Sequence, residues 1–190
     1  MSKVKVAVIG CGTIANNAHI PSYMNNPDAE IKYFCDIIPE RAKAAVEKYG
    51  CGTAIEDYHV ALNDPEIEAV SVCTPNRMHS VIAIDALRAG KNVLCEKPID
   101  ITVEAAERIE EARVRTGMTV GIVHQNRNNA VMKPIKEAVD SGRLGKQVLG
   151  TFAVKWYRDQ HYYDNGWHGT WAMDGGGSLM NQAVHTVDLM

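Results

Sequence analysis

A glycine-rich turn follows the first apolar run of the chain and constrains the fold more than any other stretch. Residues 4–9, VKVAVI, are rich in β-branched side chains and predict a strand. The next residues place Gly10, Gly12 and Ala15 in a G-x-G-x-x-A spacing, and a helix-like stretch follows. In such a unit the first glycine permits a tight turn, and the second lets the backbone approach a pyrophosphate. The sequence therefore predicts a dinucleotide-binding turn. The alternative is a corner between a strand and a helix in which glycines are needed only for steric reasons.

The helix after this turn supplies the rest of the predicted phosphate site. Backbone N–H groups at a helix N-terminus have no partner within the helix and attract anions. Thr13 and Ile14 stand at that N-terminus, and the small Ala15 lets the helix pack close to the strand. We therefore expect Gly10, Gly12, Thr13, Ile14 and Ala15 to contact the cofactor.

A second strand, predicted over residues 30–35, ends at Asp36. An acidic residue about 20 positions beyond the glycines is where such folds bind the ribose hydroxyls of NAD. Ile37 and Ile38 follow, so no basic residue adjoins Asp36 to take the 2′-phosphate of NADP, although Arg41 lies one helical turn further on. The pattern favours NAD over NADP. Asp36 could also be a helix N-cap, and the two roles are compatible.

Short apolar strands alternate with helices along residues 1–124. Strands are expected at 4–9, 30–35, 53–55, 69–73, 92–95 and 119–123, and glycines at positions 50, 90 and 117 end the intervening helices. This alternation predicts an α/β fold with a doubly wound parallel sheet, whose ligands lie at the carboxyl ends of the strands. The polar residues expected at those ends are the glycine turn, Asp36, Thr74-Pro75-Asn76, Glu96-Lys97-Pro98 and His124-Gln125-Asn126-Arg127.

The character of the chain changes after residue 124, so we expect one domain over residues 1–124 and part of a second over 125–190. A helix is predicted at 133–141 and a longer strand at 147–156, with apolar residues on both faces. A loop dense in aromatic residues and histidines follows, and a helical pattern begins at Leu179. Trp167 and Trp171 of this loop either belong to a helix core or pack on a substrate ring.

Composition excludes several classes of protein. The formal charge of −3 over 190 residues, without a basic run, argues against nucleic-acid binding. No signal-peptide pattern or membrane-spanning apolar run is present, so we expect neither secretion nor a membrane contact. The five cysteines are widely spaced and odd in number, which is typical of a reducing cytoplasm. His161 and His168 are seven apart, a spacing that suits no common metal motif, and no metal is expected.

Four motifs together resemble the Gfo/Idh/MocA family, named after glucose–fructose oxidoreductase and inositol dehydrogenase. They are Gly10-x-Gly12-x-x-Ala15, Thr74-Pro75-Asn76 with His79, Glu96-Lys97-Pro98, and Gly175-Gly176-Gly177 followed by His185 and Asp188. The resemblance spans essentially the whole chain. It implies an N-terminal Rossmann domain that binds NAD or NADP and a C-terminal α/β domain with an open mixed sheet. Members usually form oligomers through that second domain and act on sugars, sugar derivatives or cyclic polyols, so we expect a homo-oligomer, a dimer or a tetramer.

Carried over residue by residue, the resemblance makes Lys97 the catalytic lysine and His185 the catalytic histidine. Asn181 stands where the family often has an aspartate, although some sugar-nucleotide members also carry asparagine. The turn at Lys97 often contains a cis bond before its proline. The cofactor groove would be lined by Thr74, Pro75, Asn76, His79, Glu96, Lys97 and Gln125. The substrate would meet Lys97, Arg127, Trp167, Trp171, Asn181 and His185.

These residues suit the oxidation of a secondary alcohol. A hydride leaves carbon for the nicotinamide, and the protein must take a proton from oxygen. His185 could exchange that proton while Lys97 polarises the oxygen, or the two roles could be reversed. We therefore expect an NAD(P)-dependent dehydrogenase of a sugar, sugar nucleotide or cyclic polyol. Two alternatives are a non-catalytic NAD-binding module and a family member that cleaves glycosides with the cofactor recycled.

The last predicted helix, from residue 184 onward, carries no stop signal. Members of the family are longer than this chain. We therefore expect either a fragment of a longer enzyme or a truncated product, with part of the substrate site in the missing region. An unpaired strand at 147–156 would then expose an apolar edge at which chains could associate.

Overall fold

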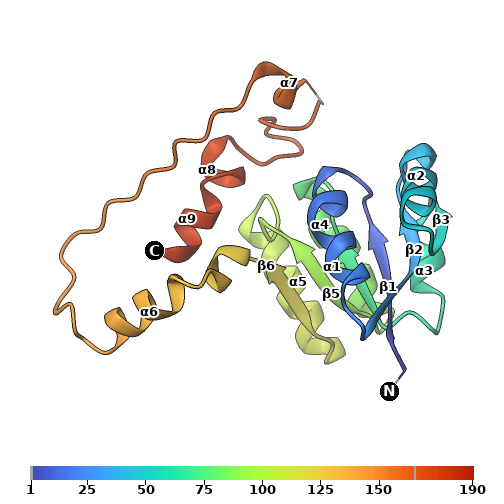
Figure 1. Cartoon of the computed structure of the whole chain (residues 1–190), viewed down its shortest axis with the longest axis horizontal. Coiled ribbons are helices and arrows are strands. Elements are labelled where there is room, and N and C mark those ends of the chain that lie inside the picture. The colour runs from blue at the N-terminus through green and yellow to red at the C-terminus, as the bar shows by residue number, and fades with distance from the viewer. Residues whose placement is uncertain (1, 165) are drawn as a thin grey trace.

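A parallel sheet forms the core of the chain from β1 to β6 (Figure 1). Within residues 2–164 and 166–190, which this computed structural model describes, six strands lie in the order β3-β2-β1-β4-β5-β6 and every neighbouring pair is parallel. This is the strand order of a Rossmann dinucleotide-binding fold, so the predicted fold class is confirmed. The strands are β1 (Val4–Ile9), β2 (Ala29–Cys35), β3 (Thr53–Ile55), β4 (Ala69–Val72), β5 (Asn92–Glu96) and β6 (Val120–Val123).

Helices cover both faces of the sheet, and the alternation of side chains along β1 shows how the two cores arise. Val8 is fully buried in one apolar cluster with Ala15 and Ile20. Its neighbours Ala7 and Ile9 belong to the cluster on the opposite face, as the two-residue period of a strand requires. The first face is covered by η1 (Ala15–His19), α1 (Ile20–Met24) and α2 (Pro39–Tyr49), and the second by α3 (Tyr58–Leu62), α4 (His79–Arg88) and α5 (Val103–Thr116).

The predicted helix ends are confirmed at α2 and α5. Pro39 occupies the first turn of α2, and Gly50 ends it in the left-handed conformation with φ 66°. Thr102 caps α5 by accepting a hydrogen bond from the Ala105 N–H. The prediction that Asp36 is a helix N-cap is wrong, because α2 begins after Ile38 and Asp36 instead closes the turn before it.

The chain beyond β6 holds short helices and long irregular stretches. These helices are η3 (Gln125–Asn128), α6 (Met132–Asp140), α7 (Gln160–Tyr163), α8 (Ser178–Asn181) and α9 (Val184–Leu189). Between α6 and α7 the chain runs apart from the sheet (Figure 1). No helix within the described ranges is both long and apolar enough to cross a membrane.

The strand predicted at 147–156 is wrong: these residues form no strand. A strand needs a hydrogen-bonded neighbour, and the described part of the chain offers none here. Val148 and Leu149 are accordingly 89% and 86% exposed. The alternative that Trp167 and Trp171 form a helix core is also wrong, because neither lies in a helix.

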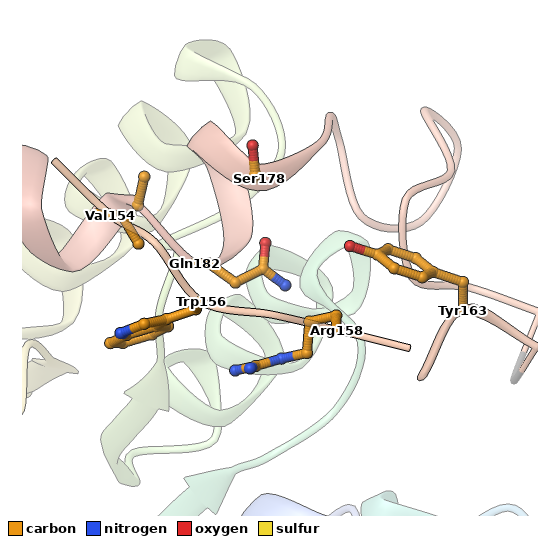
Figure 2. A pocket seen from close by; sticks show the side chains of 7 residues that line it. Val154, Trp156, Arg158, Tyr163, Ser178 and Gln182 are labelled. Carbon is orange, nitrogen blue, oxygen red and sulfur yellow. The ribbon is translucent and has the colours of Figure 1, made fainter. Parts of the chain in front are cut away.

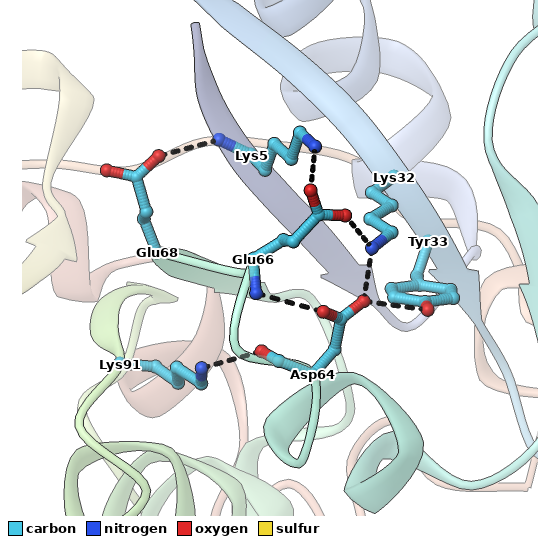
Figure 3. A network of polar contacts seen from close by, with 7 residues as sticks. All are labelled: Lys5, Lys32, Tyr33, Asp64, Glu66, Glu68 and Lys91. Carbon is cyan, nitrogen blue, oxygen red and sulfur yellow. Dashed lines mark hydrogen bonds and ion pairs between the residues drawn. The ribbon is translucent and has the colours of Figure 1, made fainter. Parts of the chain in front are cut away.

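A network of charged side chains joins strands β1 and β2 to the loop that precedes β4 (Figure 3). The Lys32 ammonium on β2 contacts both Asp64 and Glu66, and Lys5 on β1 contacts Glu66 at 2.7 Å. The Tyr33 hydroxyl donates to Asp64 at 2.9 Å. The hydrogen bond from Lys32, more than any other contact, lowers the pKa of Asp64 to about 2. The loop before β4 is thereby held to β1 and β2.

We expect Asp64→Asn to lower the urea midpoint of unfolding at pH 7. The folded state lowers the pKa of Asp64 from its usual 3.8 to about 2, so the carboxylate stabilises the fold above about pH 4. That stabilisation is lost as the pH falls towards 2, and the gap between wild type and variant should shrink over this range. Circular dichroism in urea at each pH measures it. A gap that does not change with pH contradicts the assignment, and Glu110→Gln, in an exposed pair with Arg113, should have a smaller effect at pH 7.

Candidate active site

The turn after β1 has the geometry of a dinucleotide-binding turn. Gly10 has φ +92°, and a Cβ there would lie 2.6 Å from the carbonyl oxygen of Cys73, directly after the neighbouring strand β4. Only glycine is therefore tolerated at position 10. A Cβ on Gly12 would meet nothing within 4 Å, so the space over the second glycine is open. Ala15 is fully buried where the helix meets the sheet, and these three positions fit a bound pyrophosphate.

Asp36 links this turn to the end of β2. Its Oδ2 accepts a hydrogen bond from the Cys11 N–H at 2.9 Å, and its Oδ1 accepts one from the Ile38 N–H at 2.9 Å. The carboxylate is 7% exposed. Thr13 and Ile14 are exposed beside the turn, and Arg41 is exposed on α2.

His79 joins the ends of β4 and β5. Its ring is fully buried, with Nδ1 2.7 Å from the Pro98 carbonyl oxygen and Nε2 2.9 Å from that of Thr74. The Lys97–Pro98 peptide bond is cis, as the family resemblance implied. The Thr74 hydroxyl is buried without a hydrogen-bond partner in the described part of the chain, which suits a ligand at this edge of the sheet. Pro75 is half-buried in the same turn.

Lys97 stands at the carboxyl end of β5 and reaches across to α8. Its ammonium donates to the backbone oxygen of Asn181 at 2.9 Å and to Asn181 Oδ1 at 3.0 Å. Burial lowers the pKa of Lys97, while the negative charges of Glu96 and Asp174 oppose that effect. Lys97 is thus a partly desolvated cation with defined acceptors.

A buried chain of polar groups supports the Lys97 turn from below. Glu96 Oε2 accepts a hydrogen bond from the Lys97 N–H at 3.2 Å, and Glu96 Oε1 lies 2.8 Å from His19 Nε2. His19 Nδ1 lies 2.7 Å from the Ser71 hydroxyl. All three supporting side chains are buried, so the backbone of the turn is fixed on the β4 and β5 side.

His185 of α9 is the second ionisable group of the site. It is 6% exposed, and its Nδ1 is buried without a hydrogen-bond partner among residues 2–164 and 166–190. Burial lowers the pKa of His185 most, and the neighbouring Lys97 ammonium lowers it further. The imidazole is therefore neutral near pH 7 and can accept a proton.

The other predicted contacts lie further out. Arg127 is exposed, and its guanidinium pairs with the Asp188 carboxylate, Nε to Oδ2 at 2.8 Å. Gln125 is exposed on η3. The half-buried Trp167 ring lies 3.7 Å from the His168 ring between centroids, whereas Trp171 is 83% exposed.

A small hollow of about 90 Å³ lies beside α8 (Figure 2). The Arg158 guanidinium and the Trp156 ring face it from the extended segment, with 5.7 Å between the guanidinium carbon and the ring centroid. The residues that line it are Val154, Trp156, Arg158, Tyr163, Ser178, Gln182 and Ala183. A cation beside flat rings suits a ligand that combines a negative charge with a ring.

Sequence reasoning missed several residues of this site. Asp174 is 2% exposed and bonds both to the turn after β4 and to Asn181. Asp174 could have been found from its position directly before the glycines at 175–177. His19 could have been found from its position in the helix after the glycine turn. Arg158 gave no signal, because only the fold of residues 154–183 brings it near α8. The described residues contain no group of three or more His, Cys, Asp or Glu side chains that could hold a metal ion.

Two family models match the chain. The model of an oxidoreductase family with an NAD-binding Rossmann fold, GFO_IDH_MocA, matches residues 4–124. The model of the GFO/IDH/MocA C-terminal domain matches residues 132–190. A 1,5-anhydro-D-fructose reductase of Ensifer adhaerens is 30% identical over 183 residues, which are 96% of this chain and 54% of that protein. The chain thus spans about half the length of this curated relative.

Two solved structures show the same fold at different degrees of similarity. The WlbA dehydrogenase from Bordetella pertussis, in complex with NADH and UDP-GlcNAcA, has a TM-score of 0.93 and 35% identity over 99% of this chain and 54% of that one. KijD10, a 3-ketoreductase from Actinomadura kijaniata in complex with NADP and TDP-benzene, has a TM-score of 0.68 and 29% identity, over 74% and 43% of the two chains.

We expect His79→Phe to lower the free energy of unfolding by about 2 kcal/mol. Burial lowers the pKa of His79, so the neutral ring has one N–H, and the buried carbonyl group that accepts it would lose its donor. Urea denaturation followed by circular dichroism measures the difference. His161→Phe, on the exposed α7, is the matched control and should change stability by less than about 0.5 kcal/mol. Equal effects of the two substitutions would contradict the bridging role of His79.

Proposed function

Because the chain belongs to the GFO/IDH/MocA family of NAD-binding oxidoreductases, we propose that it carries the cofactor site and catalytic groups of an NAD-dependent sugar dehydrogenase. The observation that carries this proposal is the meeting of Lys97, Asn181 and His185 at the carboxyl end of β5. Residues 1–124 form the cofactor domain in this proposal. Residues 125–190 form the first part of the substrate domain.

NAD is the proposed cofactor. Each carboxylate oxygen of Asp36 accepts one backbone N–H and retains a lone pair for a ribose hydroxyl. A 2′-phosphate at that place would be repelled by the carboxylate, which favours NAD over NADP. The WlbA complex holds NADH, whereas KijD10 holds NADP. In this chain Arg41, exposed on α2, is the cation that would have to bind a 2′-phosphate.

Proton removal from the substrate hydroxyl is the task that falls to the side chains. The bound nicotinamide would supply the hydride acceptor. Neutral His185 is proposed as the base, because its buried Nδ1 has no partner in the described ranges. Asn181 takes two of the three Lys97 N–H groups, and the third would donate to the substrate oxygen and stabilise its developing negative charge.

A sugar nucleotide is the proposed substrate class. The WlbA structure, with UDP-GlcNAcA bound, covers 99% of this chain at a TM-score of 0.93. By the family resemblance, Asn181 stands where the family often has aspartate and where some sugar-nucleotide members carry asparagine. The hollow beside α8 adds a cation, Arg158, and the Trp156 ring. An anionic substrate with a sugar ring would suit these groups.

We expect Gly12→Ala to weaken NADH binding at least ten-fold without changing the melting temperature. The added Cβ meets no protein atom within 4 Å, so any loss of affinity reports the ligand that approaches the turn. Calorimetric titration of the wild-type chain should show saturable binding of NADH and weaker binding of NADPH. Gly121→Ala on β6, whose Cβ makes only an ordinary contact, is the control and should bind NADH normally. Unaltered NADH affinity in Gly12→Ala would remove the turn from the cofactor site.

We expect Lys97→Ala and His185→Ala each to lower kcat for NAD reduction by about 100-fold or more, with UDP-GlcNAcA as the test substrate. Because the pKa of His185 lies below its usual 6.5, wild-type activity should persist at pH 6.5 and fall only at lower pH. His185→Ala should lose this acid limb. NADH affinity should stay within a few-fold of wild type in both variants.

Near wild-type turnover in both variants would refute these roles. NADH binding without turnover of UDP-GlcNAcA or of a panel of sugars and inositols by the wild-type chain would instead indicate the non-catalytic NAD-binding module.

A further inference from the structure

Asp174 is a buried carboxylate that the proposed chemistry leaves without a role. It is 2% exposed and lies in the loop before α8. Its Oδ1 accepts hydrogen bonds from Asn76 Nδ2 at 2.8 Å and from Asn181 Nδ2 at 2.9 Å. Its Oδ2 accepts the Gly169 N–H at 2.6 Å. A buried charge with three donors is a specific arrangement, because burying a carboxylate without such partners is strongly unfavourable.

Close backbone packing holds this loop against the Rossmann domain. The Arg77 N–H, in the turn after β4, donates to the Met173 carbonyl oxygen at 3.1 Å. Gly175 has φ +82°, and a Cβ there would lie 2.5 Å from Ile101 Cβ, so no larger residue fits. Asn76 Nδ2 also donates to the Asp174 backbone oxygen at 2.9 Å. Asp174 is therefore fixed relative to the turn that follows β4.

Asp174 also decides which way the Asn181 amide faces. The amide has one donating and one accepting end. Its NH₂ donates to Asp174, so its Oδ1 faces the Lys97 ammonium at 3.0 Å. The reversed amide would set its oxygen against the carboxylate and its NH₂ against the ammonium, two repulsive contacts. The carboxylate thus selects the rotamer that gives Lys97 a side-chain acceptor.

We propose that Asp174 is a positioning residue that orients Lys97 through the Asn181 amide and, through Asn76, ties this orientation to the turn beside the cofactor groove. The inference rests on the proposed dehydrogenase function for its kinetic consequence. The positions of the amide and the ammonium do not depend on it.

Asp174→Asn is the substitution that separates positioning from simple packing. The new amide has nearly the shape of the carboxylate but only one accepting end. If that end faces Asn76 and Asn181, the NH₂ meets the Gly169 N–H; if the amide turns, the NH₂ meets the two asparagine amides. In either orientation the hold on Asn181 weakens.

The loss of the Asp174 charge should change the pKa of Lys97, which a change in packing alone would not do. The ionisable groups near Lys97 are Glu96 at the end of β5, Asp174 and His168 in the loops before α8, and His185 on α9. Glu96 and Asp174 raise the pKa of Lys97, so loss of the Asp174 charge should move the Lys97 titration to lower pH.

The experiment is a pH titration of the chain labelled with ¹³Cε-lysine, in which Lys97→Arg identifies the Lys97 signal, together with kinetics on NAD and UDP-GlcNAcA. In Asp174→Asn we expect the Lys97 midpoint to move to lower pH. We expect kcat to fall about ten-fold or more, with KM for NAD within two-fold of wild type. Asp140→Asn, an exposed carboxylate on α6, is the matched control and should change neither measurement.

The double variant D174N/N181D tests the route through Asn181. Its amide at position 174 can donate to the carboxylate at 181, whose other oxygen can accept from Lys97. We expect part of the lost kcat to return, whereas losses that simply add would overturn the proposal. An unchanged Lys97 midpoint and kcat in Asp174→Asn would overturn it as well.

Two further outcomes are separable. If Asp174→Asn does not fold, Asn181→Ala leaves Asp174 its bonds to Asn76 and Gly169, and wild-type kcat in that variant would overturn the proposal. If the wild-type chain turns nothing over, the dehydrogenase proposal fails, yet the Lys97 titration still decides whether Asp174 acts on the lysine.

Discussion

The parallel direction of all the sheet's strands is the constraint on which the site depends. Each crossover returns the chain to the same edge, so the strands end side by side although their ends are far apart in the sequence. The glycine turn, Asp36, Thr74 and Lys97 meet there for this reason alone. The switch in strand order between β1 and β4 opens the crevice in which such folds bind their ligands.

Buried carboxylates hold the loops at that edge. Asp36, Glu96 and Asp174 are each at most 7% exposed, and each is bound by backbone N–H groups or by side-chain donors. Because an unpaired carboxylate would be strongly destabilised by burial, each one specifies the geometry of the loops that supply its donors. The charges of Glu96 and Asp174 limit how far burial lowers the pKa of Lys97.

The two parts of the chain contribute differently to the site. The Rossmann part supplies rigid strand ends, whereas residues 169–185 add Asp174, Asn181 and His185 by packing against those ends. The segment between α6 and α7 packs little against the rest of the chain, because its apolar residues are largely exposed. Its end nevertheless brings Trp156 and Arg158 close to α8. The meeting of Lys97, Asn181 and His185 therefore depends on a few close backbone contacts rather than on a large second core.

The glycine turn, the helix ends and the order of strands and helices followed from local chemistry. Gly10 must have a positive φ, Pro39 and Gly50 delimit α2, and β-branched runs mark the strands. Lys97 and His185 were predicted from the family resemblance, because no local pattern joins two residues so far apart in the chain. The strand predicted at 147–156 failed because strand formation needs a neighbour that the local sequence cannot supply.

By itself the sequence determined the α/β class and the glycine turn, because these depend on backbone conformation and side-chain type, and it predicted which side chains are candidates for the chemistry. Only the tertiary structure decided that Asn76, Asp174 and Asn181 form one hydrogen-bonded series leading to Lys97, or that His79 bridges two strand ends. Those contacts join residues far apart in the chain. Their geometry comes from the packing of loops onto the sheet edge, which no local pattern encodes.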